Sequence, residues 1–289
     1  HLGDAEMAVY QSTPARGAMI MLQLDPISLI ALAAVTLIGL PHGAMDAAVA
    51  LALGYGRNFG KMAVFVLAYV LLAAVVVGFW IVAPVLALAL FLLISLVHFG
   101  LGDTEAQDPI HKYVQMIAHG SVVTVAIPFW HKQEVSTVFE MISGPHNWLW
   151  PLMDGAAVIC VLAGIAYAVL ALGQPGLRRG FAEWLSLMAI VAVLPPLVGF
   201  AVYFTLVHTP RHVLRISHAL KARDLPVWGM TAGFTGATWA MAAVAWLLLA
   251  GRIGVDAASL QIVFIGLAAL TVPHMILIDG VFRPGLRSA

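Results

Sequence analysis

The amino-acid sequence predicts an all-α fold, a polytopic bundle of membrane-spanning helices, and two observations carry this prediction. Of the 289 residues, 62% are hydrophobic and only 10% are charged, against about 45–50% and about 25% in an average globular domain. Apolar runs close to the roughly 20 residues that a helix needs to cross the hydrocarbon core alternate with short stretches of glycine, proline and charge. Runs of this length and composition are typical of membrane spans.

We expect about nine spans, preceded by a lead-in or cloning remnant at residues 1–24. Residues 25–289 then form a single transmembrane domain. The weakest breaks, at Pro84 and Pro195–Pro196, depend on proline removing a helix hydrogen bond and clashing with the preceding turn. The expected spans are Pro26–Leu53, Met62–Val82, Pro84–Gly102, Ile110–Phe129, Leu152–Leu172, Phe181–Leu194, Leu197–Leu220, Gly229–Leu249 and Ala257–Leu277.

Basic residues beside the spans predict the orientation of the chain. One side carries Arg57, Lys61, Lys112, Arg178, Arg179, Arg215, Lys221, Arg223, Arg283 and Arg287, and the other carries Arg16, Lys132 and Arg252. Because basic residues gather on the cytoplasmic side, we expect the N-terminus outside and the C-terminus in the cytoplasm. This topology predicts a multi-pass protein of the cell inner (plasma) membrane. Tryptophans at both ends of the outer loop Trp130–Pro151 favour a short interfacial helix there.

Composition also excludes several classes of protein. The formal net charge is +0 and no long basic run occurs, so the sequence has no electrostatic footprint for nucleic acid. The single cysteine, Cys160, lies within an apolar run. An intrachain disulfide and a thiolate metal cluster are therefore excluded, and any metal must be held by nitrogen and oxygen.

The sequence HTPRH follows the apolar run Leu197–Val207 and contains His208 and His212. Residues four apart lie on nearly the same face of a helix, so both imidazoles can reach one point. Such a pair also arises by chance, but a polar side chain at membrane depth is costly and is a functional-site candidate. The spacing therefore predicts a chelating pair.

Three more histidines lie in predicted spans that run in the same direction, His42 within the first span and His98 and His274 near the ends of the third and ninth. His42 lies in PHGAMD, His98 in HFGLGD and His274 in PHMILID. A lone helical histidine is more often a packing residue, but these three and the HTPRH pair all fall in the inner half of the bilayer. Imidazole suits iron, copper and zinc, so five at one depth favour a nitrogen-rich metal site.

Acidic residues follow three of these histidines. Asp46 lies four residues after His42, on nearly the same helix face, where its carboxylate can orient the ring. Asp103 and Asp279 each lie five residues after a histidine, which is off-face in a regular helix. For Asp103, a solvated loop charge and a partner of the site remain open alternatives.

Together the four motifs PHGAMD, HFGLGD, HTPRH and PHMILID resemble the Brp/Blh family of bacterial and archaeal membrane β-carotene dioxygenases, from about Asp25 to the C-terminus. The resemblance implies that residues 25–289 are a catalytic domain that cleaves β-carotene at its central double bond with dioxygen. The products would be two molecules of all-trans-retinal, which could pass to a rhodopsin. It also implies an Fe(II) cofactor with the ligands His42, His98, His208 and His212. His274 matches a further family position, either a ligand or a partner of one.

A carotenoid substrate requires a long apolar tunnel within the bilayer. We expect it to be lined by aromatic and sulfur side chains, although each of these is also a packing candidate. The expected lining residues are Phe200, Tyr203, Phe204, Trp239 and Met275, with Gly199 and Ala240 as small residues facing the tunnel.

Two other functions remain as alternatives. A membrane transporter or channel for a metal ion would also place histidines and aspartates in its helices. A diiron desaturase or hydroxylase would need several histidine boxes, whereas this sequence has one His-x-x-x-His.

Overall fold

The computed structural model describes residues 24–39, 43–104, 108–221 and 227–282. Those residues form helices and connecting turns and contain no strand, so the all-α prediction is confirmed for them. Most of the predicted lead-in, residues 1–24, and the predicted ligand His42 lie outside the described residues.

Within the described ranges, six helical segments are long and apolar enough to cross a membrane, which agrees with a polytopic membrane protein. These segments are α4 (Phe59–Val82), α5 (Pro84–Asp103), Pro109–Trp130 (α6, Pro109–Ser121, with η3, Val122–Ala126, and α7, Ile127–Trp130), α9 (Leu149–Gly173), Trp228–Ile253 in α13 (Val227–Ile253), and Val255–Val281 (α14, Val255–Met275, running into η6, Ile276–Phe282).

The other three predicted spans are shorter or interrupted. The first contains α1 (Pro26–Ala34), the π-helix η1 (Val35–Gly39) and α3 (Asp46–Ala52). The sixth is α10 (Arg178–Val193), of 16 residues. The seventh joins α11 (Pro196–Val202), the π-helix η5 (Tyr203–His208) and the polar-faced α12 (Thr209–Lys221). The number nine stays a prediction.

Both proline breaks occur where the sequence predicts them. Helix α4 ends at Val82 and α5 begins with Pro84, while α10 ends at Val193 and α11 begins with Pro196. Each proline occupies the first turn of the new helix, where a backbone N–H has no partner inside the helix. Proline therefore starts a helix at each break.

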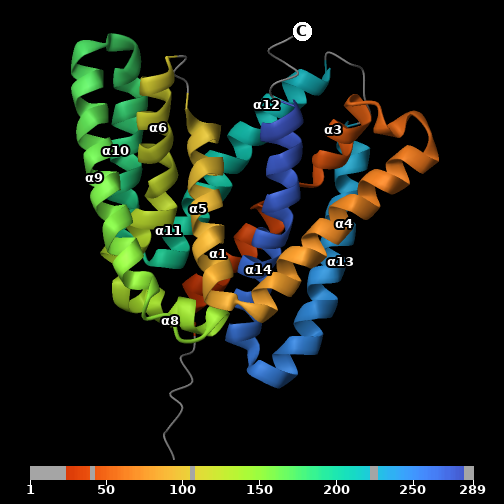
Figure 1. Ribbon diagram of the computed structural model, residues 1–289. Helices are drawn as coiled ribbons and strands as arrows, with labels where there is room; N and C mark the ends of the chain where they lie inside the picture. The colour runs from red at the N-terminus through yellow and green to blue at the C-terminus, as the bar shows by residue number, and fades with distance from the viewer. Residues whose placement is uncertain (1–23, 40–42, 105–107, 222–226, 283–289) are drawn as a thin grey trace, which may run out of the picture.

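The expected short helix in the outer loop is also present, as α8 (Lys132–Ser143). It buries Val135, Phe139 and Ile142 against the bundle. Trp80 Nε1 donates a hydrogen bond to the carbonyl of Ile142 at 3.0 Å. Helix α8 thereby covers one end of the bundle, the lower end in Figure 1.

Close packing fixes α5 against α6. A side-chain carbon on Gly100 would overlap the carbonyl of Met116, and one on Gly120 would overlap the carbonyl of Leu96. Small residues allow helix backbones to approach in this way. Helix α14 lies beside α5, and α9 and α10 lie on the far side of α6 (Figure 1).

Helices α4 and α13 form the opposite flank of the bundle (Figure 1). Trp80 is the one buried residue of α4. In the most apolar 18-residue stretch of α13, only 6% of the residues are buried. Contiguous exposed apolar surface on this scale is typical of a membrane-facing wall.

Candidate functional site

Four of the five histidines that the sequence places at one depth lie together inside the bundle. His98 comes from α5, His208 ends η5, His212 lies in α12 and His274 lies near the end of α14. Each is at most 4% exposed. Segments more than 170 residues apart in sequence, from His98 to His274, therefore meet at this point.

The ring separations suit a shared metal ion. At a metal–nitrogen distance of about 2.1 Å, two imidazoles on one ion hold their ring centroids roughly 4.5–6.5 Å apart. The centroid of His98 lies 5.1 Å from those of His208 and His274 and 6.3 Å from that of His212. The centroid of His212 lies 6.0 Å from that of His208 and 4.8 Å from that of His274. All five separations fall within the expected interval.

The donor atoms themselves do not yet converge. Among the described residues, no three histidine, cysteine or acidic side chains form a ready metal-binding group. The Nε2 atoms of His208, His212 and His274 are buried from solvent. Binding one ion at this point therefore requires the rings to rotate so that their donor atoms converge.

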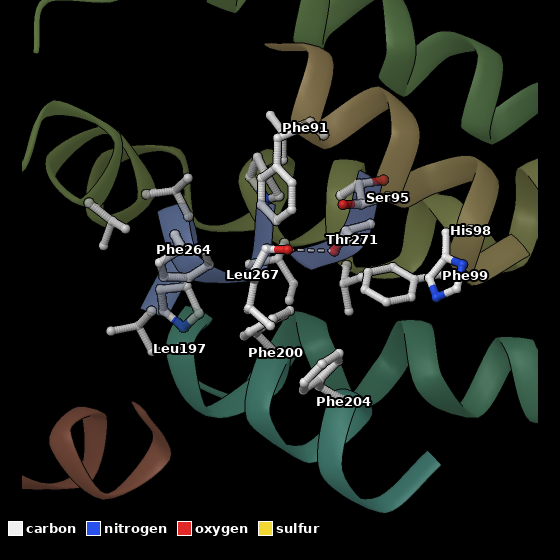
Figure 2. A pocket seen from close by; sticks show the side chains of 18 of the residues that line it. Phe91, Ser95, His98, Phe99, Leu197, Phe200, Phe204, Phe264, Leu267 and Thr271 are labelled. Atoms are coloured by element: carbon white, nitrogen blue, oxygen red, sulfur yellow. Dashed lines mark hydrogen bonds between the residues drawn. The ribbon is translucent and has the colours of Figure 1, made fainter. Parts of the chain in front are cut away.

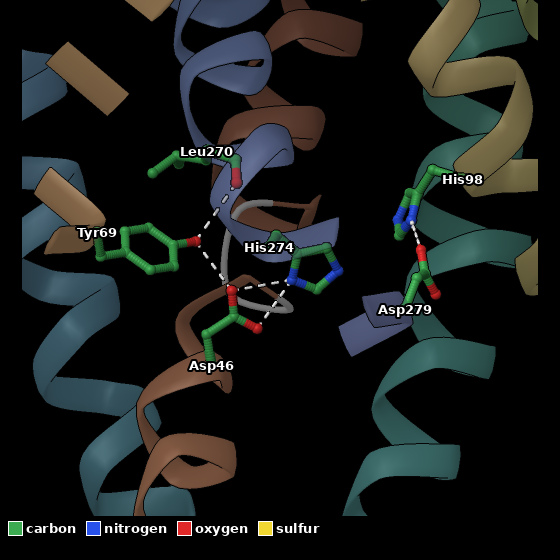
Figure 3. Close-up of polar contacts among 6 residues, drawn as sticks. All are labelled: Asp46, Tyr69, His98, Leu270, His274 and Asp279. Carbon is green, nitrogen blue, oxygen red and sulfur yellow. Dashed lines mark hydrogen bonds and ion pairs between the residues drawn. The ribbon is translucent and has the colours of Figure 1, made fainter. Parts of the chain in front are cut away.

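Two carboxylates hold two of these rings (Figure 3). His98 Nδ1 lies 3.1 Å from Asp279 Oδ2, and His274 Nδ1 lies 2.8 Å from Asp46 Oδ1. The hydroxyl of Tyr69 donates to Asp46 Oδ2 at 2.9 Å. A carboxylate that accepts from Nδ1–H fixes the tautomer with its lone pair on Nε2, the form in which a histidine binds metal.

The partner of Asp46 differs from the expected one. Sequence spacing pairs Asp46 with His42, which lies outside the described residues, whereas the carboxylate contacts His274 of a distant helix. Asp279, which lies five residues after His274, reaches His98 of α5. The π-helix η6 contains Asp279, so the spacing of a regular α-helix does not describe where that carboxylate points.

Asp103 is buried, so the solvated loop charge is wrong for this residue. Its side chain is 1% exposed and accepts a hydrogen bond from the hydroxyl of Tyr203 at 2.6 Å. Arg211, within HTPRH, donates to the same carboxylate at 3.1 Å and pairs with Glu183 of α10 at 2.6 Å. This network connects η5, with His208, and α12, with His212, to α5, with His98.

An apolar cavity opens beside the histidines (Figure 2). It encompasses about 980 Å³ of space not occupied by atoms, a figure that includes open solvent at its mouth. It extends from His98 and His274 to α8 at the end of the bundle. Apart from these two histidines and three hydroxyl side chains, the lining is apolar: Gly43, Phe91, Leu92, Ser95, Phe99, Val123, Thr124, Ile127, Pro128, Val135, Val138, Phe139, Pro196, Leu197, Phe200, Phe204, Phe264, Leu267, Leu270 and Thr271.

Two of the five expected tunnel residues, Phe200 and Phe204, line this cavity. Tyr203 instead points its hydroxyl at Asp103. Trp239 is 37% exposed on the peripheral helix α13 and donates to the carbonyl of Thr36, and Met275 is half-buried outside the lining.

The two small residues expected to face the tunnel lie elsewhere. Gly199 faces Val191 and Ile127, and Ala240 is exposed on α13. Sequence reasoning also missed Ser95 and Thr271, although each lies three residues before a site histidine and so on a neighbouring part of the same helix face.

Fold and site together define a helical membrane protein whose buried histidine cluster faces an apolar cavity. The sequence matches the family model described as Beta-carotene 15,15'-dioxygenase over residues 33–281. A curated relative of that name, from Uncultured marine bacterium 66A03, is 36% identical over 260 residues, which cover 88% of this chain and 94% of the relative. The chain therefore belongs to the beta-carotene 15,15'-dioxygenase family of carotenoid-cleaving oxygenases, and the resemblance found in its motifs is confirmed. No solved structure gives a significant match.

The contact between Tyr203 and Asp103 predicts a structural effect for Tyr203→Phe. Loss of a buried hydrogen bond to a charged acceptor should lower the free energy of unfolding by about 1–3 kcal/mol, measured by denaturation in detergent micelles. Tyr113→Phe, at a 60% exposed tyrosine of α6, is the matched control and should change little. Equal stability of the two variants would contradict a bracing role for Tyr203.

Proposed function

We propose that this protein is an iron-dependent β-carotene 15,15'-dioxygenase. The central carbon–carbon double bond of β-carotene breaks and two carbon–oxygen double bonds form, so that one β-carotene and one dioxygen give two molecules of all-trans-retinal. The observation that carries the proposal is the buried histidine cluster at one end of an apolar cavity of about half the length of the substrate.

The length of the cavity follows from helix geometry. Its wall on α14 includes residues from Phe264 to His274, and ten residues at 1.5 Å each span about 15 Å. A carotene is a rigid rod about as long as the hydrocarbon core is thick, roughly 30 Å. One half of the rod therefore fits between α8 and the histidines, which brings the central bond beside them. The other half has to extend beyond the histidines.

The ligands we propose for Fe(II) are His42, His98, His208 and His212, with His274 as a further ligand or a partner of one. The donor set fits this ion because neutral imidazoles suit ferrous iron and leave open positions for a small molecule. Bound iron would supply the redox chemistry that dioxygen activation requires. Asp46 and Asp279 would orient the rings of His274 and His98, respectively.

The remaining side chains of the site keep water out and hold the substrate. Phe99 and Phe204 pack on His208, with ring centroids 4.7 and 5.7 Å from that of the imidazole. The only polar side chains that a hydrocarbon in the cavity would meet, among the described lining residues, are three hydroxyls and two imidazoles. An apolar substrate dissolved in the bilayer can therefore enter without passing through water.

The finer topology belongs to the same proposal. We place residues 25–289 in the cell inner (plasma) membrane as one catalytic domain with nine spans, the N-terminus outside and the C-terminus in the cytoplasm. The distribution of basic residues beside the spans supports this orientation. Retinal released into the bilayer could then pass to a rhodopsin.

The alternative of a metal-ion transporter or channel loses its support. A pathway for an ion needs charged or carbonyl groups along its length, whereas the cavity beside the histidines is lined almost entirely by apolar side chains.

Alanine substitution tests the metal ligands. His98→Ala, His208→Ala and His212→Ala, together with His42→Ala, should each lose bound iron and cleavage activity, because the remaining ligands hold the ion weakly. Iron per protein is measured by elemental analysis after purification. His218→Ala, at an exposed histidine of α12, should keep its iron. Full occupancy in all four ligand variants would refute the assignment.

Asp46→Asn tests the orienting carboxylate. Since the amide cannot hold the His274 ring as the carboxylate does, iron affinity should fall by roughly tenfold to a hundredfold, measured by competition with a chelator. Asp154→Asn, at an exposed aspartate paired with Lys132, is the control. Unchanged iron affinity in Asp46→Asn would reduce Asp46 to a packing role.

Val138→Phe tests the position of the substrate. Val138 lines the cavity at its α8 end, so the larger ring should shorten the cavity and lower kcat/KM for β-carotene by at least about tenfold, the effect of roughly 1.4 kcal/mol. Iron content should stay the same. Val161→Phe, on the exposed face of α9, should be neutral. Normal turnover in Val138→Phe, or one long and one short apocarotenal as products, would exclude central cleavage in this register.

A further inference from the structure

Three hydroxyl side chains line the otherwise apolar cavity, on α5, η3 and α14. Two of them bond to their own helices: Thr271 Oγ1 donates to the carbonyl of Leu267 at 2.7 Å, and Thr124 Oγ1 donates to that of Gly120 at 2.9 Å. Helical serine and threonine commonly use their hydroxyl protons in this way. Neither of these two threonines therefore offers a free proton to the cavity.

Ser95 is different. It is 4% exposed and lines the cavity, yet within the parts of the chain that the structure describes its hydroxyl makes no hydrogen bond. Every other described serine makes one, namely Ser28, Ser121, Ser136, Ser143, Ser186, Ser217 and Ser259. A hydroxyl that opens onto a cavity and donates to no group of the protein has its proton available for an acceptor on the molecule that fills the cavity.

The position of Ser95 identifies where that acceptor lies. Ser95 precedes His98 by three residues, which is one turn, about 4.5 Å along the helix and about 60° around it. In Figure 2, Ser95 lies on α5 between Phe91 and His98, at the histidine end of the cavity. The acceptor must therefore be close to the reacting bond and not at the α8 end, where an ionone ring would sit.

We propose that the hydroxyl of Ser95 donates a hydrogen bond to the aldehyde oxygen of retinal, the product that occupies this cavity. The inference depends on the proposed central cleavage, which creates a carbonyl at the histidine end of a chain whose ring points towards α8. The hydrocarbon β-carotene has no oxygen and offers Ser95 no acceptor. Ser95 therefore distinguishes product from substrate and slows the release of the retinal held in the cavity.

Ser95→Ala tests the proposal on the full-length, iron-containing protein under anaerobic conditions, where β-carotene binds without being cleaved. Dissociation constants for all-trans-retinal and for β-carotene are measured by quenching of tryptophan fluorescence. Loss of one neutral hydrogen bond should weaken retinal binding roughly two- to tenfold and leave β-carotene binding unchanged. The carbonyl stretching band of bound retinal should also move to higher wavenumber, as expected for a carbonyl that has lost a donor.

Thr271→Val is the matched control, because it removes a cavity hydroxyl whose proton is already used by Leu267. It should leave the ratio of the two dissociation constants and the carbonyl band as in the wild type. Overturning results are an unchanged ratio and band in Ser95→Ala, or an equal change in Thr271→Val. Failure of the proposed function gives a different result: the wild-type protein then neither cleaves nor binds β-carotene. That result would also remove the basis of this inference.

Discussion

The carboxylate–histidine pairs inside the bundle are the interaction on which the site depends. A polar group at membrane depth is costly unless it has a partner, and His98 and His274 find theirs in Asp279 and Asp46. Each pair crosses between elements, from α5 to η6 and from α14 to α3. The hydrogen bonds that stabilise the His98 and His274 rings inside the bundle therefore also connect the elements that carry these two histidines to distant parts of the chain.

Departures from regular helix geometry make these pairings accessible. Asp279 lies in the π-helix η6, which begins two residues after His274, and His208 is the last residue of the π-helix η5. A π-turn inserts an extra residue and so rotates the following side chains relative to an α-helix, a feature frequent at functional sites. His208 lies close to α5: a side-chain carbon built on Gly102 would be in ordinary van der Waals contact with its ring, at 3.6 Å.

Much of the fold and the identity of the histidines can be predicted from the sequence, because these features are local. Apolar length marks the spans, proline marks the breaks at Pro84 and Pro196, and histidine spacing with span direction brings His98, His208, His212 and His274 to one depth. Partners across helices are not local. The contact of Asp46 with His274 depends on how α3 packs on α14, and a spacing of four residues after His42 carries no information about it.

The tunnel residues show a second reason why sequence falls short. In a soluble helix a polar face identifies the apolar side that is buried, but a membrane helix is apolar on its lipid face as well as on its inner face. Trp239 on the lipid-exposed α13 and Phe200 beside the cavity therefore have similar sequence surroundings. The histidines are a better guide to the cavity lining. Ser95 and Thr271 each lie one turn before a site histidine, on a neighbouring part of the same helix face, and both line the cavity.

Because the cavity holds only one half of the symmetric β-carotene molecule, the two halves of the substrate have different surroundings during cleavage. In the proposed register one retinal forms inside the described cavity, with its ring towards α8 and its aldehyde beside His98, while the other forms beyond the histidines. Only the first lies against Phe91, Phe200 and Ser95. The two products are identical molecules, yet they leave different surroundings, and the described cavity can accept the next carotene only after the retinal held there has left.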